Sequence, residues 1–100
     1  MTQHRLEVEG REFQLEPQPI RTSLTDGPAM LWGFEVRVLH DGREVGVKTC
    51  FVGRVSVQFK DASAPDAPIE QLLPVLHELA FEKIASRLKD GEYGDEIIFA

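Results

Sequence analysis

Hydrophobic and polar residues alternate on either side of Gly10, from Leu6 to Glu9 and from Phe13 to Leu15. A period of two residues is typical of half-buried β-strands, so this stretch predicts an N-terminal hairpin. Two registers satisfy the pattern. A four-residue loop around Gly10 pairs Leu6 with Leu15, whereas a two-residue loop at Glu9-Gly10 pairs Leu6 with Phe13. Both registers keep the same residues on the apolar face.

The strongest pattern lies between residues 30 and 60 and predicts a three-stranded antiparallel meander. Asp41-Gly42 is a preferred dipeptide for a two-residue type I′ turn, which pairs His40 with Arg43. Counting outward from that turn aligns Val38 with Val45, Val36 with Val47, Phe34 with Thr49, and Trp32 with Phe51. A second turn at residues 52–54 continues the apolar face into a third strand with Val55, Val57 and Phe59. A slip of one residue would move every apolar side chain to the other face.

Three prolines and an Asp-Gly pair lie within residues 17–28, which are predicted to form a long loop. Long loops often carry binding sites, although a plain connection between strands is the commoner role. A second loop, residues 61–68, separates the meander from a helix.

That helix is predicted from the helical spacing of apolar residues before Gly91, which is its expected stop. Asp66 is its expected N-cap. Pro74 either begins the main helix or kinks a longer one. The predicted buried centre consists of Leu72, Leu73, Leu76 and Ala80. The strip of the helix predicted to be exposed to solvent consists of Gln71, Glu78 and Glu82.

The apolar positions extend unusually far around this helix, more than one sheet face would cover. Either the loops and the tail Ile97–Phe99 wrap the remainder, or a second subunit does, since symmetric homodimers are the commonest assembly. The tail itself is a candidate edge strand beside the first hairpin. The residues expected to line such a dimer interface, or a pocket, are Val75, Leu79, His77, Phe81 and Tyr93.

Together these elements predict one α+β domain spanning residues 1–100. Its antiparallel sheet combines the N-terminal hairpin with the meander and is covered on one face by the C-terminal helix. A short C-terminal edge strand completes the expected fold.

Composition agrees with a globular, cytoplasmic protein. Of the 100 residues, 42% are hydrophobic and 28% charged, which are ordinary globular values. No apolar run approaches the roughly 18 residues that a membrane span needs, and the N-terminus has no signal-peptide core. Cys50 is the single cysteine, so no internal disulfide forms, as expected in a reducing compartment. Arginine outnumbers lysine and asparagine is absent, which favours a GC-rich bacterial genome.

The net charge of −6 argues against nucleic-acid binding, because contacts with phosphates require a basic surface. A local basic bias is nevertheless expected on the uncovered face of the meander, from Arg37, Lys48, Arg54 and Lys60. We interpret this face either as a docking surface for an anionic ligand or acidic partner, or as an ordinary solvated sheet face.

The sequence gives little indication of catalytic or metal-binding chemistry. The sequence contains no recognised catalytic or nucleotide-binding motif. Cys50 is the candidate nucleophile, and the register above places it on the uncovered face, with no histidine beside it. His4, His40 and His77 are not gathered by their spacing, so no metal site and no cofactor are predicted.

The leading interpretation is therefore a small non-catalytic protein-interaction module that forms a homodimer. One alternative is a small-ligand-binding domain, with the ligand between helix, sheet and the long loop. Another is an acidic inhibitor or immunity-type protein that binds a basic partner. An enzyme ranks last.

Overall fold

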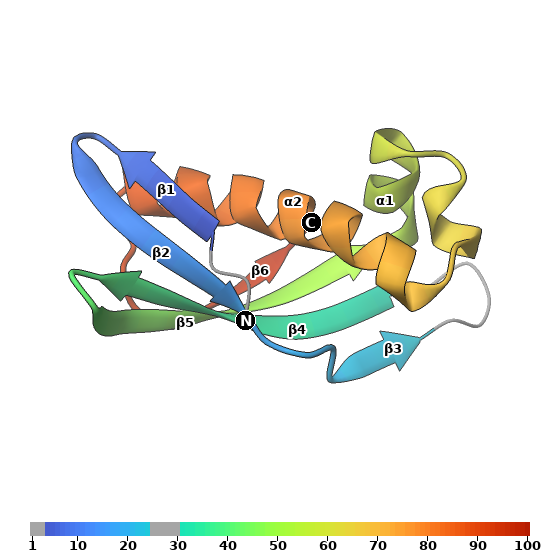
Figure 1. Ribbon diagram of the computed structural model, residues 1–100, viewed down its shortest axis with the longest axis horizontal. Coiled ribbons are helices and arrows are strands. Elements are labelled where there is room, and N and C mark those ends of the chain that lie inside the picture. Colours follow the sequence, from blue (N-terminus) through green and yellow to red (C-terminus); the bar gives the residue numbers. More distant parts are fainter. Residues whose placement is uncertain (1–3, 25–30) are drawn as a thin grey trace.

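A computed structural model describes residues 4–24 and 31–100 and confirms the α+β class. Within these ranges a six-stranded, mostly antiparallel sheet packs with one long C-terminal helix (Figure 1). The strands are β1 (His4–Val8), β2 (Arg11–Pro17), β3 (Thr22–Leu24), β4 (Leu31–His40), β5 (Arg43–Gly53) and β6 (Glu96–Phe99). The helices are α1 (Arg54–Lys60), the short 3₁₀ helix η1 (Ala64–Asp66) and α2 (Ile69–Lys89). The strand order is β1-β2-β4-β5-β6, and β3 pairs with β4.

The first hairpin adopts the two-residue alternative. Leu6 pairs with Phe13, and both turn residues have positive φ, 51° at Glu9 and 80° at Gly10, as a type I′ turn requires. After β2 the chain stays on the same edge of β4 and resumes pairing there as β3. Part of the predicted loop 17–28 is therefore strand, and positions 25–28 lie outside the described residues.

The second hairpin turns at Asp41-Gly42 and pairs His40 with Arg43 as predicted, but the expected register beyond the turn is wrong. A β-bulge leaves Val45 without a pairing partner in β4 and shifts the remaining pairs by one residue. The observed pairs are Val38–Gly46, Val36–Lys48, Phe34–Cys50 and Trp32–Val52. The side chains of Lys48 and Cys50 therefore lie on the buried face of the sheet, and those of Val47, Thr49 and Phe51 lie on the opposite face.

The predicted third strand of the meander is also wrong, because residues 54–60 form α1. Val57 is its buried residue, while Val55 and Phe59 are exposed. The chain leaves the sheet at Gly53, and the position beside β5 is taken by β6. β6 pairs with β5 in parallel, after a crossover through α1, η1 and α2, and not beside the first hairpin as the sequence suggested.

Helix α2 begins directly after Pro68, so Asp66 is not its cap, and Pro74 lies inside the helix instead of starting it. Its end at Gly91 is confirmed. Gly91 has φ +83° and its N–H donates to Leu88 O, while the N–H of Glu92 donates to Arg87 O. These two bonds form a Schellman motif, which a residue without a Cβ at the left-handed position favours.

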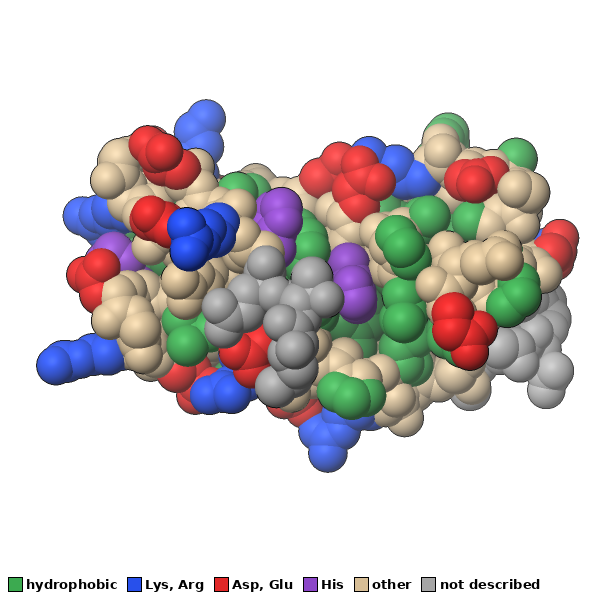
Figure 2. All heavy atoms as spheres, in the orientation of Figure 1, with side chains coloured by type: hydrophobic (Ala, Val, Ile, Leu, Met, Phe, Trp, Pro, Cys, Tyr) green, Lys and Arg blue, Asp and Glu red, His purple; other side chains and the backbone are tan. Residues whose placement is uncertain are grey.

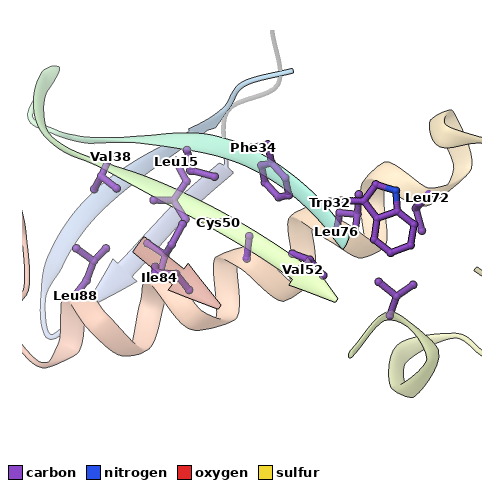
Figure 3. Packing of buried hydrophobic residues seen from close by; sticks show 14 of the residues in the cluster. Leu15, Trp32, Phe34, Val38, Cys50, Val52, Leu72, Leu76, Ile84 and Leu88 are labelled. Atoms are coloured by element: carbon purple, nitrogen blue, oxygen red, sulfur yellow. The ribbon is translucent and has the colours of Figure 1, made fainter. Parts of the chain in front are cut away.

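The core lies between α2 and the sheet (Figure 3). The buried residues of α2 follow one stripe, Leu72, Leu76, Ala80, Ile84 and Leu88. Leu73, predicted to be central, is only half-buried. Full burial of each large aliphatic side chain contributes about 1.5–3 kcal/mol, so this stripe fixes how α2 lies on the sheet. Within the described ranges, no helix is long and apolar enough to cross a membrane.

Candidate interaction surfaces

The four basic residues predicted to share one face are dispersed. Arg37 binds two carboxylates, Glu44 at 2.6 Å and Glu16 at 3.3 Å, and these partners hold its pKa above the ordinary value, Glu44 most strongly. Lys48 is buried, and Arg54 opens α1. Lys60 closes α1 and lies among carboxylates of α2. The structure therefore provides no common basic docking surface from these residues.

Lys48 serves as an internal anchor. Its side chain is fully buried, and its Nζ donates to Glu92 O at 2.8 Å, Gly94 O at 2.7 Å and Glu96 Oε2 at 3.2 Å. An ammonium group has three donors, so these contacts use all of them. The predicted ligand contact thus holds the segment that leads into β6.

Cys50 is not positioned as a nucleophile. Its thiol is buried in the core between sheet and α2, and burial raises its pKa to about 12, against a smaller opposing influence of Lys48. A cysteine reacts as a thiolate, which this site strongly disfavours. The bulge in β5 is the reason, because it turns Cys50 inward.

The first candidate surface is the free edge of β6. The N–H of Ala100 donates to Phe51 O and its C=O accepts from Gly53 N, so Ala100 directs both backbone groups at β5. Backbone groups alternate in direction along a strand, so Ile97 and Phe99 direct theirs away from β5. Among the described strands, none pairs with that side of β6.

The side chains of the same two residues are exposed. Ile97 is 60% and Phe99 72% exposed, and the Phe99 ring stacks on Phe51 with 5.5 Å between centroids. We call Phe51, Ile97, Phe99 and the open backbone of β6 the β6 edge. Open backbone groups next to exposed apolar side chains are the usual features of a strand that pairs with another chain.

Three contacts besides those of Lys48 hold this edge in place. Asp95 Oδ1 accepts from the backbone N–H of Val47 at 2.9 Å. Arg87, in the last turn of α2, lies 3.3 Å from carboxylate oxygens of both Glu92 and Glu96. The edge is therefore presented by an ordered segment tied to both α2 and β5.

The second candidate surface is a groove of about 740 Å³ between β1 and α2. We call it the β1–α2 groove. Leu6, Leu73, Pro74 and Ala85 contribute apolar lining, and Glu70, Glu78 and Glu82 are the acidic lining residues. Figure 2 views this side of the molecule, where hydrophobic side chains gather beside two histidines.

Three rings form the middle of the groove lining. His4 stacks on Phe81 with 4.5 Å between ring centroids and 10° between planes. The ring centroid of His77 lies 5.9 Å from that of Phe81. The His77 ring also contacts Phe34 of the core edge-on, with 5.6 Å between centroids. Partial burial lowers the pKa of His77, so its ring is neutral at neutral pH. The groove wall is thus aromatic at this point, and the His77 ring in it is uncharged.

Of the residues predicted to line an interface or pocket, His77 and Phe81 are brought together in this groove. Val75 and Leu79 instead pack, half-buried, against the core. Tyr93 is separate, since its ring lies 5.6 Å from Phe13 and its hydroxyl accepts from Arg11 Nη1 at 2.8 Å.

Sequence reasoning missed His4 and Leu6 as groove residues. It predicted Ile97–Phe99 as an edge strand but placed this strand beside the first hairpin instead of β5. The alternation in β1 marked Leu6 as apolar, but only the neighbouring α2 turns it into a groove wall. Residues 4–24 and 31–100 contain no group of three or more histidine, cysteine or acidic side chains arranged to hold a metal. Comparisons with protein-family models, curated proteins and solved structures gave no significant match to this chain.

Proposed function

We propose that this chain is a non-catalytic protein-interaction module that works as a homodimer joined through the β6 edge. The observation that carries the proposal is the coincidence at Ile97 and Phe99 of open backbone groups and side chains that are 60% and 72% exposed. Burial of the Cys50 thiol, which raises its pKa to about 12, supports a non-catalytic role, because the reactive thiolate is disfavoured there.

The edge is self-complementary in one antiparallel register. If the two-fold axis passes beside Ile98, then Ile97 of each copy lies opposite Phe99 of the other. Both residues direct their backbone groups outward, so each such pair exchanges both of its backbone hydrogen bonds. Their exposed side chains meet on the same face, as cross-strand pairs do. The result is one sheet continuous across two copies, with an isologous interface.

The other end of the sheet supports this choice. The opposite edge strand, β1, carries Arg5 and Glu7 with exposed side chains, and charged residues on an edge disfavour pairing with another chain. Ile97 and Phe99 offer no such protection on β6. The two ends of the strand order therefore differ in the property that controls edge-to-edge association.

The mass in solution tests the dimer. Multi-angle light scattering is expected to give the wild-type chain twice its monomer mass and to give the double variant Ile97→Lys/Phe99→Lys the monomer mass. Phe59→Lys is the matched control, because Phe59 is 87% exposed on α1, away from β6. A wild-type monomer at high concentration would refute the proposal, as would a dimer that survives the double variant.

Disulfide trapping tests the register. Residues in a hydrogen-bonded antiparallel pair have Cα atoms about 5.5 Å apart, within disulfide range, whereas diagonal neighbours lie about 7–8 Å apart. A mixture of Ile97→Cys and Phe99→Cys is therefore expected to cross-link on oxidation, and each variant alone is not. Cys50 does not compete, because it is buried. Cross-linking of either variant alone would contradict the axis at Ile98.

A further inference from the structure

We infer that the β1–α2 groove binds an amphipathic helix from a partner protein, with an apolar stripe that enters the groove and Lys or Arg residues beside it. This inference rests on the proposed interaction role but not on the homodimer. β1 and β6 lie at opposite ends of the strand order, so the groove stays open when two copies meet at the β6 edge.

The shape of the groove favours a helix. Its lining residues on α2 recur at intervals of three and four, from Glu70 through Leu73, His77 and Phe81 to Ala85. These positions form a stripe separate from the buried one and span about 22 Å at 1.5 Å per residue. A long, shallow surface between a helix and a strand matches helix-in-groove recognition, where side chains at i, i+3/i+4 and i+7 act as anchors.

The middle of the groove provides the anchor site. The stacked His4 and Phe81 rings and the neutral His77 form an aromatic wall, with Leu73 and Pro74 beside it. Aliphatic or aromatic side chains of a partner would pack against these rings and lose contact with water there. Binding energy is concentrated in central contacts of this kind, where side chains of both partners are removed from water.

Charge decides the chemistry of the partner. The charged residues of the groove lining are all acidic, Glu70, Glu78 and Glu82. Lys60 lies 2.7 Å from Glu82 and 3.4 Å from Glu78, while Glu70 forms no ion pair within the described parts of the chain. One ammonium against three carboxylates leaves the lining negative, as is the protein overall at −6. Complementarity therefore selects a basic partner helix.

Isothermal titration calorimetry with defined peptides tests the inference. The probe is a peptide of about 15 residues, the helical length of the groove, with Leu at i, i+3/i+4 and i+7 and Lys elsewhere. A scrambled peptide of the same composition and a Leu/Glu peptide of the same pattern are the controls. Only the patterned Leu/Lys peptide is expected to bind, and added salt should weaken it.

Two pairs of variants localise the binding. Glu70→Gln/Glu78→Gln should weaken it about fivefold, since two exposed ion pairs are lost. Glu7→Gln/Glu12→Gln removes the same charge outside the groove and should have no effect. Phe81→Ala should weaken it about tenfold and Phe59→Ala should not. Circular dichroism checks that each variant is folded.

Equal binding of the scrambled peptide, or affinities unchanged in the groove variants, would overturn the inference. The monomeric variant Ile97→Lys/Phe99→Lys separates the two proposals. It is expected to bind the Leu/Lys peptide as the wild-type chain does, because its substitutions lie on β6. Absence of peptide binding would not affect the mass measurement, and a monomeric wild-type chain would not affect the titration.

Discussion

The Nζ atom of Lys48 lies 2.7 Å from the carbonyl oxygen of Gly94, two residues before β6 begins. This contact joins the buried face of β5 to the segment that connects α2 with β6. Two further acceptors, Glu92 O and Glu96 Oε2, complete the surroundings of the buried ammonium. A buried charge is tolerated only when it is paired and fully hydrogen-bonded, and all three donors of Lys48 are occupied here. Lys48 thereby holds the β6 edge in position.

Replacing Lys48 with methionine is expected to lower the free energy of unfolding by about 3 kcal/mol. Methionine keeps a similar side-chain length but leaves the carbonyls of Glu92 and Gly94 and the Glu96 carboxylate without their donor. Urea unfolding measures the change. Lys83→Met, which alters an exposed lysine of α2, is the control and should change stability little. A loss below about 1 kcal/mol would contradict the anchoring role.

Hydrogen exchange in the same Lys48→Met variant reports where the stability is lost. The amides of Ile98 and Ala100, which point at β5, are expected to exchange faster relative to those of β4. Uniform acceleration across the sheet would instead indicate general destabilisation of the core.

Gly46 is required for the close approach of the same segment. A Cβ at position 46 would collide with the carbonyl oxygen of Tyr93 and would lie 2.9 Å from that of Gly94. Both contacts are with backbone, which cannot rotate away. Gly46→Ala is therefore expected to cost about 2 kcal/mol, measured by urea unfolding. Gly94→Ala is the control, since nothing lies within 4 Å of a Cβ there. Equal effects of the two substitutions would refute the collision.

His77 gives stability a dependence on pH. Burial lowers its pKa in the folded state, so the unfolded chain takes up the proton more readily. Its contribution is constant above the ordinary pKa of 6.5 and falls as the pH drops below that value, by about 1.4 kcal/mol for each unit of pKa depression.

Comparing the stability of His77→Gln with wild type at about pH 7.5 and about pH 5 isolates this contribution. The variant is expected to lose less stability on acidification than the wild-type chain. His40→Gln, which removes the histidine beside the turn that ends β4, is the comparison. An identical acid sensitivity of His77→Gln and wild type would contradict the assignment.

Local rules were sufficient for the class of the fold and for the turn at Asp41-Gly42, but the turn expected at residues 52–54 is absent, because β5 leads directly into α1 there. The turn at Asp41-Gly42 and the helix stop at Gly91 depend on backbone conformations that a few neighbouring residues dictate. Helical periodicity also predicted the solvent-exposed side of α2, and the three residues assigned to it, Gln71, Glu78 and Glu82, are exposed. The same periodicity pointed to His77 and Phe81, two of the groove residues.

Only the tertiary structure decided the register of β5 and the surfaces that depend on it. Apolar residues occur on both faces of this strand, so the pattern accommodates either side, and the bulge at Val45 determines which one is buried. Burial of Lys48 depends on acceptors 44 to 48 residues further along the chain. The sequence alone therefore determined secondary structure only where neighbouring residues control the backbone conformation. Long-range contacts decided strand order, the inward turn of Cys50 and the open edge at Ile97 and Phe99.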